Sequence, residues 1–195
     1  MESFIQKVKF QTKELVYRNI KGKKVLILFV ITNLVYAFML MVTIPMVMNF
    51  SDGMKLFDMM PMGYDPSYAV SLLEKLGVEG RNAYLYRQIP VDLIYPFLFA
   101  ISYGVLLGYL LNKVNGLKNN YFYLCLVPVF AGFFDYMENF GIVNMILSYP
   151  DLWVPAIHLT NFFTIMKSLL STINFSVLIV LLIIFGVKKI ISKRL

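Results

Sequence analysis

Four ionisable side chains lie inside long apolar stretches of this sequence, where charges are costly and therefore informative. They are Asp92, Asp135, Glu138 and Lys167. Three carboxyl groups near one ammonium cannot all be ionised in a medium of low dielectric unless a cation binds, so at least one of them is expected to hold a proton. Such a group could bind a ligand or carry acid/base chemistry. With the neighbouring amide of Asn139, these residues are the primary candidates for a ligand pocket.

The spacing of the polar residues predicts that they share helix faces. Asp135, Glu138 and Asn139 follow an i, i+3, i+4 pattern, which places them on one side of a helix. A longer stripe with 4,3,4,3 spacing contains Thr160, Thr164, Lys167, Ser171 and Asn174. One shorter stripe contains Gln88, Asp92, Tyr95 and Ser102, and another contains Asn33, Tyr36 and Thr43. One-sided stripes predict a bundle with a polar interior. Secondary pocket candidates are Arg87, Asn161, Thr164 and Ser171.

The elements that must position these residues are transmembrane helices. Hydrophobic residues make up 59% of the chain and charged residues 15%, against roughly 25% charged residues in an average soluble domain. The apolar runs are continuous and do not alternate in short pieces, which favours helices over a β-barrel. The predicted fold is all-α, a bundle of four transmembrane helices, in one membrane domain spanning residues 1–195.

The predicted spans cover residues of about 25–50, 91–112, 121–147 and 155–187, each long enough to cross a bilayer. The first run is too long for the apolar core of a cleavable signal peptide. Residues 51–90 form an external loop with a helix of its own, since Asp65 can cap a helix, Pro66 suits its first turn and Gly77 suits its exit. A short amphipathic helix is predicted before the first span, at residues 4–20.

The net charge of +7 is concentrated beside the spans, before the first, after the last and in the loop between the second and third. This is the positive-inside pattern, and it predicts a multi-pass membrane protein with both termini in the cytoplasm. The expected partners are membrane lipids and a lipid-like small molecule; nucleic acid is not expected.

The depth of the charged residues follows from the helix rise. Asp92 and Lys167 each lie about 30 Å from the inner ends of their helices, and Asp135 and Glu138 lie roughly 21 and 26 Å outward from Tyr121. All four therefore fall in the outer third of the bilayer, which predicts a pocket that faces outward.

The sequence lacks the residues that several kinds of chemistry require. The single cysteine, Cys125, excludes an internal disulfide and a CxxC motif. His158 is the single histidine and has no partner to orient it as a base, so neither a metal site nor a cofactor is predicted. The sequence contains no HExxH motif, nucleophile elbow or phosphate-binding glycine loop.

Several short segments carry a resemblance to known proteins: GYDP at 63–66, LLEKLG at 72–77, EGR at 79–81, PVDLIYP at 90–96 and DYMEN at 135–139. Together they resemble a family of small bacterial four-helix membrane proteins of unassigned activity. This resemblance implies the fold and a place in a bacterial inner or plasma membrane, and it implies no function. The chain is also similar, in topology and in an acid near the start of the second helix, to the EXPERA superfamily of sterol isomerases and the sigma-2 receptor. The catalytic residues of those isomerases do not align with this chain, so their activity is not implied.

Three functions remain open from the sequence. The leading hypothesis is a binding protein for a small amphiphile or lipid, or for a proton-coupled ligand, in the outward-facing polar pocket. The second is a lipid-modifying, isomerase-like enzyme in which Glu138 and Asp135 act as acid and base. The third is a structural or accessory subunit in which the same residues hold helices together.

Overall fold

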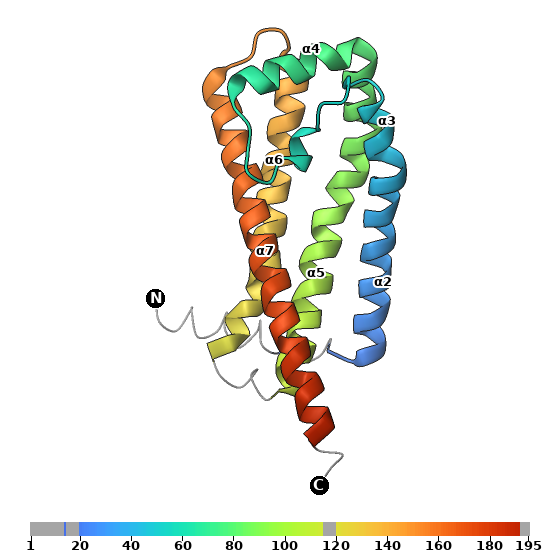
Figure 1. The fold of residues 1–195 in the computed structure, drawn as a ribbon, viewed down its shortest axis with the longest axis vertical. Helices are drawn as coiled ribbons and strands as arrows, with labels where there is room; N and C mark the ends of the chain where they lie inside the picture. The colour runs from blue at the N-terminus through green and yellow to red at the C-terminus, as the bar shows by residue number, and fades with distance from the viewer. Residues whose placement is uncertain (1–13, 15–19, 115–119, 192–195) are drawn as a thin grey trace.

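The computed structural model describes residues 14, 20–114 and 120–191, and the long elements in this part of the chain are all helical (Figure 1). The first long helix consists of three consecutive parts: α2 (Gly22–Phe38), the π-helical segment η1 (Met39–Thr43) and α3 (Ile44–Met48). The short 3-10 helix η2 (Phe57–Met59) follows it. The second combines α4 (Pro66–Ala83), the π-helical segment η3 (Tyr84–Gln88) and α5 (Ile89–Lys113). The third begins as the 3-10 helix η4 (Asn120–Leu126) and continues as α6 (Val127–Ser148), and the fourth is α7 (Val154–Ile191).

Four of these helical stretches are long and apolar enough to cross a membrane, as an integral membrane protein requires: Gly22–Met48, Pro66–Lys113, Tyr121–Ser148 and Val154–Ile191. The predicted all-α four-helix fold is therefore confirmed. The second stretch begins at Pro66, before its predicted span, because it includes the helix expected in the external loop, and the other three differ from the predicted spans by a few residues at their ends. The amphipathic helix predicted at residues 4–20 falls almost entirely outside the described residues.

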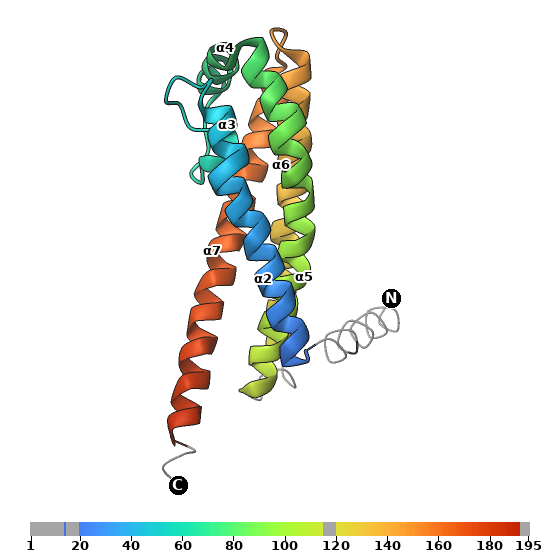
Figure 2. The same ribbon diagram turned by 90° about the vertical axis from the view of Figure 1, so that its right-hand side faces the viewer.

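Two helices form the centre of the bundle and two form its flanks. In the most apolar windows of the spans, 44% of the α5 residues and 39% of the α6 residues are buried, against 17% for α2 and for α7. α2 packs on α5, α7 packs on α6, and within the described residues α2 and α7 have almost no direct contact. Figure 2 shows α7 diverging from α2 and α5 toward its C-terminal end. One side of the bundle is therefore open between α2 and α7.

The other end of the bundle is covered by α4, which lies across it (Figure 1). The helix begins as predicted, because the Asp65 carboxylate accepts hydrogen bonds from the Ser67 hydroxyl at 2.6 Å and the Tyr68 N–H at 2.7 Å. These two bonds hold the pKa of Asp65 below its usual value. Gly77 interrupts the helix with a φ of +58°, at the predicted exit. We call this end of the bundle the capped end.

An apolar core joins the cap to the bundle. Leu72, Leu73 and Leu76 of α4 are almost fully buried in it. The Phe57 ring packs on the rings of Tyr64 and Tyr84, at centroid distances of 4.9 and 6.3 Å. This core fixes the loop before α4 against the membrane helices.

α6 and α7 approach each other closely at Gly141. A Cβ atom on this glycine would lie 2.8 Å from the Thr160 Cβ and closer still to the hydroxyl and methyl of that side chain. Small residues allow two membrane helices to approach in this way, and the resulting backbone proximity fixes how α6 and α7 face each other.

Gly141→Ala is expected to push α6 and α7 apart and to destabilise the bundle by about 1–3 kcal/mol, the usual cost of overpacking. The matched control is Gly186→Ala on α7, where a Cβ would meet nothing within 4 Å; its helix propensity alone favours alanine by up to about 1 kcal/mol. Thermal unfolding in detergent measures both. Equal melting temperatures for the two variants would contradict the close approach.

Candidate functional site

The charged residues of α6 and α7 form one buried ion group. Lys167 of α7 pairs with the Glu138 carboxylate, and its Nζ lies 3.4 Å from the Asp135 Oδ1. The Thr164 hydroxyl donates a further hydrogen bond to Glu138 at 2.7 Å. Glu138 is fully buried, and the side chains of Asp135 and Lys167 are 9% and 15% exposed. The predicted polar faces of α6 and α7 therefore meet.

Asn139 extends this group to α5. Its side-chain nitrogen lies 3.3 Å from the backbone oxygen of Asp92 and 3.4 Å from the Asp135 Oδ1. The carboxylate of Asp92 is different. The residue is 3% exposed, yet among the described residues its side chain has no hydrogen-bond or ion-pair partner.

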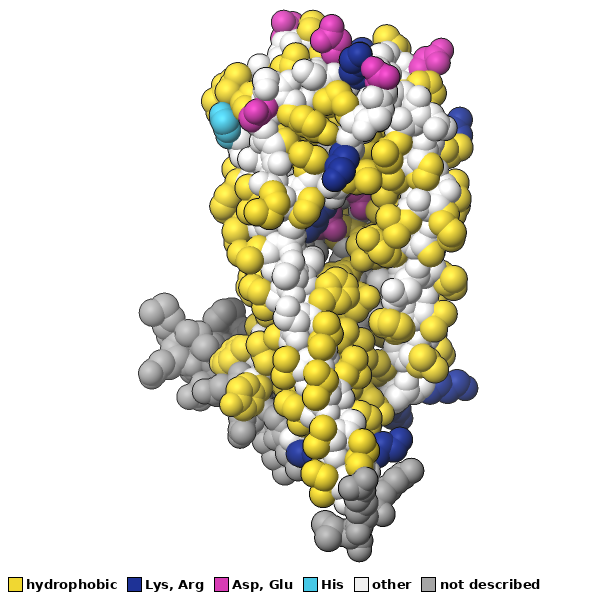
Figure 3. All heavy atoms as spheres, in the orientation of Figure 1, with side chains coloured by type: hydrophobic (Ala, Val, Ile, Leu, Met, Phe, Trp, Pro, Cys, Tyr) yellow, Lys and Arg dark blue, Asp and Glu magenta, His cyan; other side chains and the backbone are white. Residues whose placement is uncertain are grey.

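A cavity of about 530 Å³ lies against this carboxylate, between α2, α5 and α7. It is lined by Asn33, Tyr36, Leu40 and Ile44 of the first long helix, Asp58 and Met59 of the loop, Asp92, Tyr95, Phe99 and Tyr103 of α5, Ala131 and Asp135 of α6, and Lys167, Ser168, Ser171 and Phe175 of α7. Figure 3 shows an opening in the apolar face of the bundle with acidic and basic side chains inside it. The volume lies within the range of roughly 300–1,000 Å³ that small-molecule sites occupy.

The end of the cavity nearest the cap contains Asp58, which sequence reasoning did not select. Its carboxylate accepts hydrogen bonds from the Tyr84 hydroxyl at 2.6 Å and from the Gln88 side-chain nitrogen at 3.4 Å. Gln88 is bonded in turn to the Thr43 hydroxyl, so the two π-helical segments are joined beside this loop. Asp58 was missed because it lies in a stretch predicted to be an external loop, where an acid carries no signal.

The remaining candidates divide between the cavity and its supports. Ser171 lines the cavity, whereas Thr164 binds Glu138 away from it. Asn161 accepts a hydrogen bond from the Tyr64 N–H at 2.8 Å and so anchors the loop to α7. Arg87 lies in a separate cavity, which it shares with Glu79. Arg87 is therefore not available to balance the carboxylates of the first cavity.

Aromatic rings form much of the remaining wall. Tyr36 of α2 stacks on Tyr95 of α5 at 5.2 Å, and the Tyr103 ring lies 4.6 Å from Phe99 and 5.3 Å from Phe175. Tyr36 and Tyr95 belong to the predicted polar stripes. Phe99 and Phe175 carried no signal, because a phenylalanine in a membrane helix faces lipid as often as it faces a pocket.

Two further polar side chains are buried nearby without support. Ser102 and Asn174 are fully buried, and in the described part of the chain neither the serine hydroxyl nor the asparagine amide has a hydrogen-bond partner. Both lie on the predicted stripes, so the polar interior extends beyond the cavity. Among the described residues, no group of three histidine, cysteine, aspartate or glutamate side chains could hold a metal ion.

The arrangement limits the chemistry that the acids can perform. Asp92 and Asp135 face the cavity, but Glu138 does not line it and is occupied by Lys167 and Thr164. An acid/base pair of Glu138 and Asp135 would therefore have one member out of reach of a molecule in the cavity. The geometry favours binding at the free carboxylate of Asp92.

Comparison with known proteins adds no relative: no protein-family model, no curated protein and no solved structure matches this chain.

Lys167→Met is expected to lower the free energy of unfolding by about 3 kcal/mol, because it leaves two buried carboxylates without their cation. The matched control is Lys75→Met, which removes an exposed ion pair to Asp52 and should change stability little. Thermal unfolding in detergent again provides the measurement.

A second variant tests the cause of this loss. Lys167→Met combined with Glu138→Gln removes one of the two stranded charges and should recover part of the stability. If Lys167→Met unfolds at the same temperature as Lys75→Met, the buried ion group does not hold α6 and α7 together.

Proposed function

We propose that this protein binds a small amphiphile or lipid, which enters the cavity between α2, α5 and α7 from the surrounding bilayer. The polar part of the ligand lies against Asp92, and its apolar part faces the aromatic wall. Within the described part of the chain, α2 and α7 have almost no direct contact, which supports entry from the side because it leaves that face of the bundle open to lipid.

The observation that carries this proposal is the carboxylate of Asp92. A buried polar group without a partner costs stability, so proteins pair nearly all of them. Asp92 is 3% exposed, lines a large cavity and has no partner among the described residues. A ligand that supplies the partner would remove this cost when it binds.

A structural role accounts for part of the polar group and complements the binding role. Glu138, Thr164 and Lys167 join α6 to α7, and they do so without help from a ligand. Their role does not explain Asp92 or the space in front of it. We therefore divide the candidates into residues that hold the helices and residues that face the ligand.

We further propose that the capped end lies outside the cell and that both ends of the chain lie in the cytoplasm, in a bacterial plasma membrane. The basic residues flanking the spans support this orientation. It places the cavity in the outer half of the bilayer.

Ser171→Trp should fill the cavity and displace its ligand while α7 still folds, because Ser171 lies on the cavity wall. The control is Ser176→Trp, the same change on the same helix at an exposed position. Mass spectrometry of molecules that remain bound after purification should find an amphiphile with the control and with the unaltered protein, and little or none with Ser171→Trp. Identical bound molecules in both variants would contradict the proposal.

The orientation predicts that a cysteine at Ser67, an exposed position of α4, reacts with a membrane-impermeant maleimide on intact cells. A cysteine at Asn112, exposed near the opposite end of α5, should react only after permeabilisation. Background labelling should be small because the native Cys125 is buried. Labelling of Asn112→Cys alone in intact cells would reverse the orientation.

A further inference from the structure

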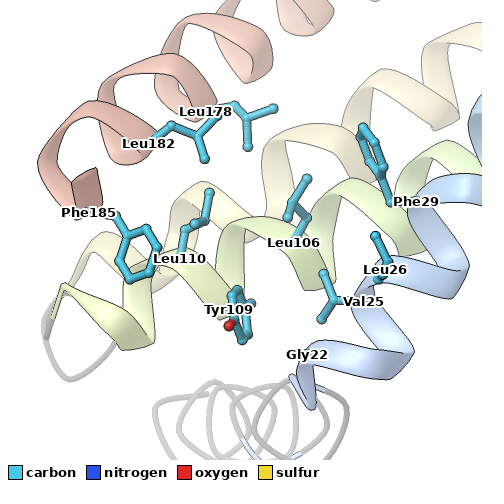
Figure 4. Close-up of a pocket in the computed structure, with 10 residues that line it drawn as sticks. All are labelled: Gly22, Val25, Leu26, Phe29, Leu106, Tyr109, Leu110, Leu178, Leu182 and Phe185. Carbon is cyan, nitrogen blue, oxygen red and sulfur yellow. The ribbon is translucent and has the colours of Figure 1, made fainter. Parts of the chain in front are cut away.

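A second cavity lies in the same gap between helices, toward the end where α2 begins and α7 ends. It has a volume of about 380 Å³. Figure 4 shows α5 as its floor and side chains of α2 and α7 as its two walls. Apart from Gly22 and the hydroxyl of Tyr109, its lining is entirely apolar. We call this cavity the apolar groove.

The groove and the polar cavity adjoin along all three helices. On α2, Phe29 lines the groove and Asn33, one turn later, lines the polar cavity. On α5 the neighbours are Leu106 and Tyr103, and on α7 they are Leu178 and Phe175. The two spaces therefore lie end to end in the gap between α2 and α7, and we refer to them together as the lateral channel.

Aromatic rings mark the boundary between the two sections. The Tyr103 ring lies 6.0 Å from the Phe29 ring and 5.3 Å from the Phe175 ring, in edge-on contacts with both. One ring comes from each of the three helices that line the channel. Phe29 and Phe175 each touch Tyr103, but among the described residues these two rings make no ring contact with each other. An extended alkyl chain can therefore lie over Tyr103 between them, whereas a polar headgroup would lose its hydrogen bonds there.

The charges of the polar cavity select the sign of the headgroup. Asp58, Asp92 and Asp135 line it, and Lys167 is the single lysine or arginine among its lining residues. Lys167 is already paired with Asp135 and Glu138, and Asp58 accepts two hydrogen bonds. The unpaired carboxylate of Asp92 therefore favours a ligand with a cationic group. A phosphate would find no unpaired cation on this wall.

From these observations we infer that the ligand is a single-chain amphiphile with a cationic headgroup that lacks phosphate. Its ammonium group pairs with Asp92, and its chain passes between the aromatic rings into the apolar groove. This inference rests on the proposed function and names the class of the ligand. From Asn33 to Gly22 the channel follows α2 for roughly 16 Å. This is about the length of 13 carbon atoms in an extended alkyl chain, in which each bond of roughly 1.5 Å advances about 1.3 Å along the chain.

Photolabelling in lipid nanodiscs tests this assignment without competing detergent. The probe is a dodecyl amine with a diazirine near the end of its chain, and matched probes carry a trimethylammonium, phosphocholine or hydroxyl headgroup on the same chain. The two cationic probes should label the protein saturably and more tightly than the other two. Crosslinks mapped by mass spectrometry should fall on groove residues such as Leu106, Leu110 and Leu182.

Two pairs of variants test the headgroup contact and the placement of the alkyl chain separately. Asp92→Asn should weaken binding of the amine about tenfold, the effect of losing one charge-assisted hydrogen bond, and should leave the hydroxyl probe unchanged. Asp52→Asn, at an exposed position of the capped end, serves as its control. Leu182→Trp in the groove should reduce labelling by all probes, whereas Ile183→Trp, exposed on the same helix, should not.

Each outcome decides a different statement. If no probe labels the protein saturably, both the proposed function and this inference fail. If all headgroups bind equally and Asp92→Asn changes nothing, amphiphile binding stands and the cationic headgroup is wrong. If the cationic probes are preferred but crosslink outside the groove and ignore Leu182→Trp, the placement of the chain is wrong.

Discussion

The buried pairing of Lys167 with Asp135 and Glu138 is the interaction on which the rest of the site depends. An unpaired charge in hydrocarbon is costly, so α6 and α7 must turn these side chains toward each other. Thr164 reinforces the pairing, and the close contact at Gly141 fixes the same relative rotation of the two helices. Because the one ammonium is shared by these two acids, the third membrane carboxylate, Asp92, remains without a cation. The pairing that stabilises α6 against α7 therefore leaves the Asp92 carboxylate of α5 unpaired and able to bind a ligand.

The opening to lipid follows from the unequal burial of the helices. α5 and α6 make contact on several sides, whereas α2 and α7 are each held from one side. In water such exposed apolar flanks would associate, but a bilayer gives them an apolar environment and no comparable force to close the gap. The polar groups are therefore placed at the back of an open channel, inside an apolar rim, where an amphiphile dissolved in the bilayer can reach them.

Hydropathy was sufficient to predict an all-α fold with four helices able to span a membrane. Spacing was sufficient to predict that Asp135 and Glu138 meet Lys167, because charges at similar depth in a bilayer are stabilised by pairing with one another. The relative rotation and packing of the helices could not be predicted. Arg87 was a candidate for the same pocket as Asp92, but their separation of five residues corresponds to about 140° around the helix axis, and the two line different cavities. Asn161 turned out to anchor the loop through the Tyr64 N–H. Asp58 gave no signal, since its position beside the cavity depends on the folding of a loop around Tyr84 and Gln88.

The cavity itself is difficult to explain as a by-product of helix packing. Protein interiors are close-packed, and a polar recess that lipid can enter loses the contacts that a filled interior would make. Small side chains keep this one open where larger apolar residues could fill it: Ala131, Ser168 and Ser171 all lie on its wall. A bundle stabilised only by the ion group of α6 and α7 would gain by closing that space and by replacing Asp92 with an apolar residue. The chain retains both the space and the free carboxylate. These two costs would be offset together by one event, the binding of a molecule that fills the volume and pairs with the charge.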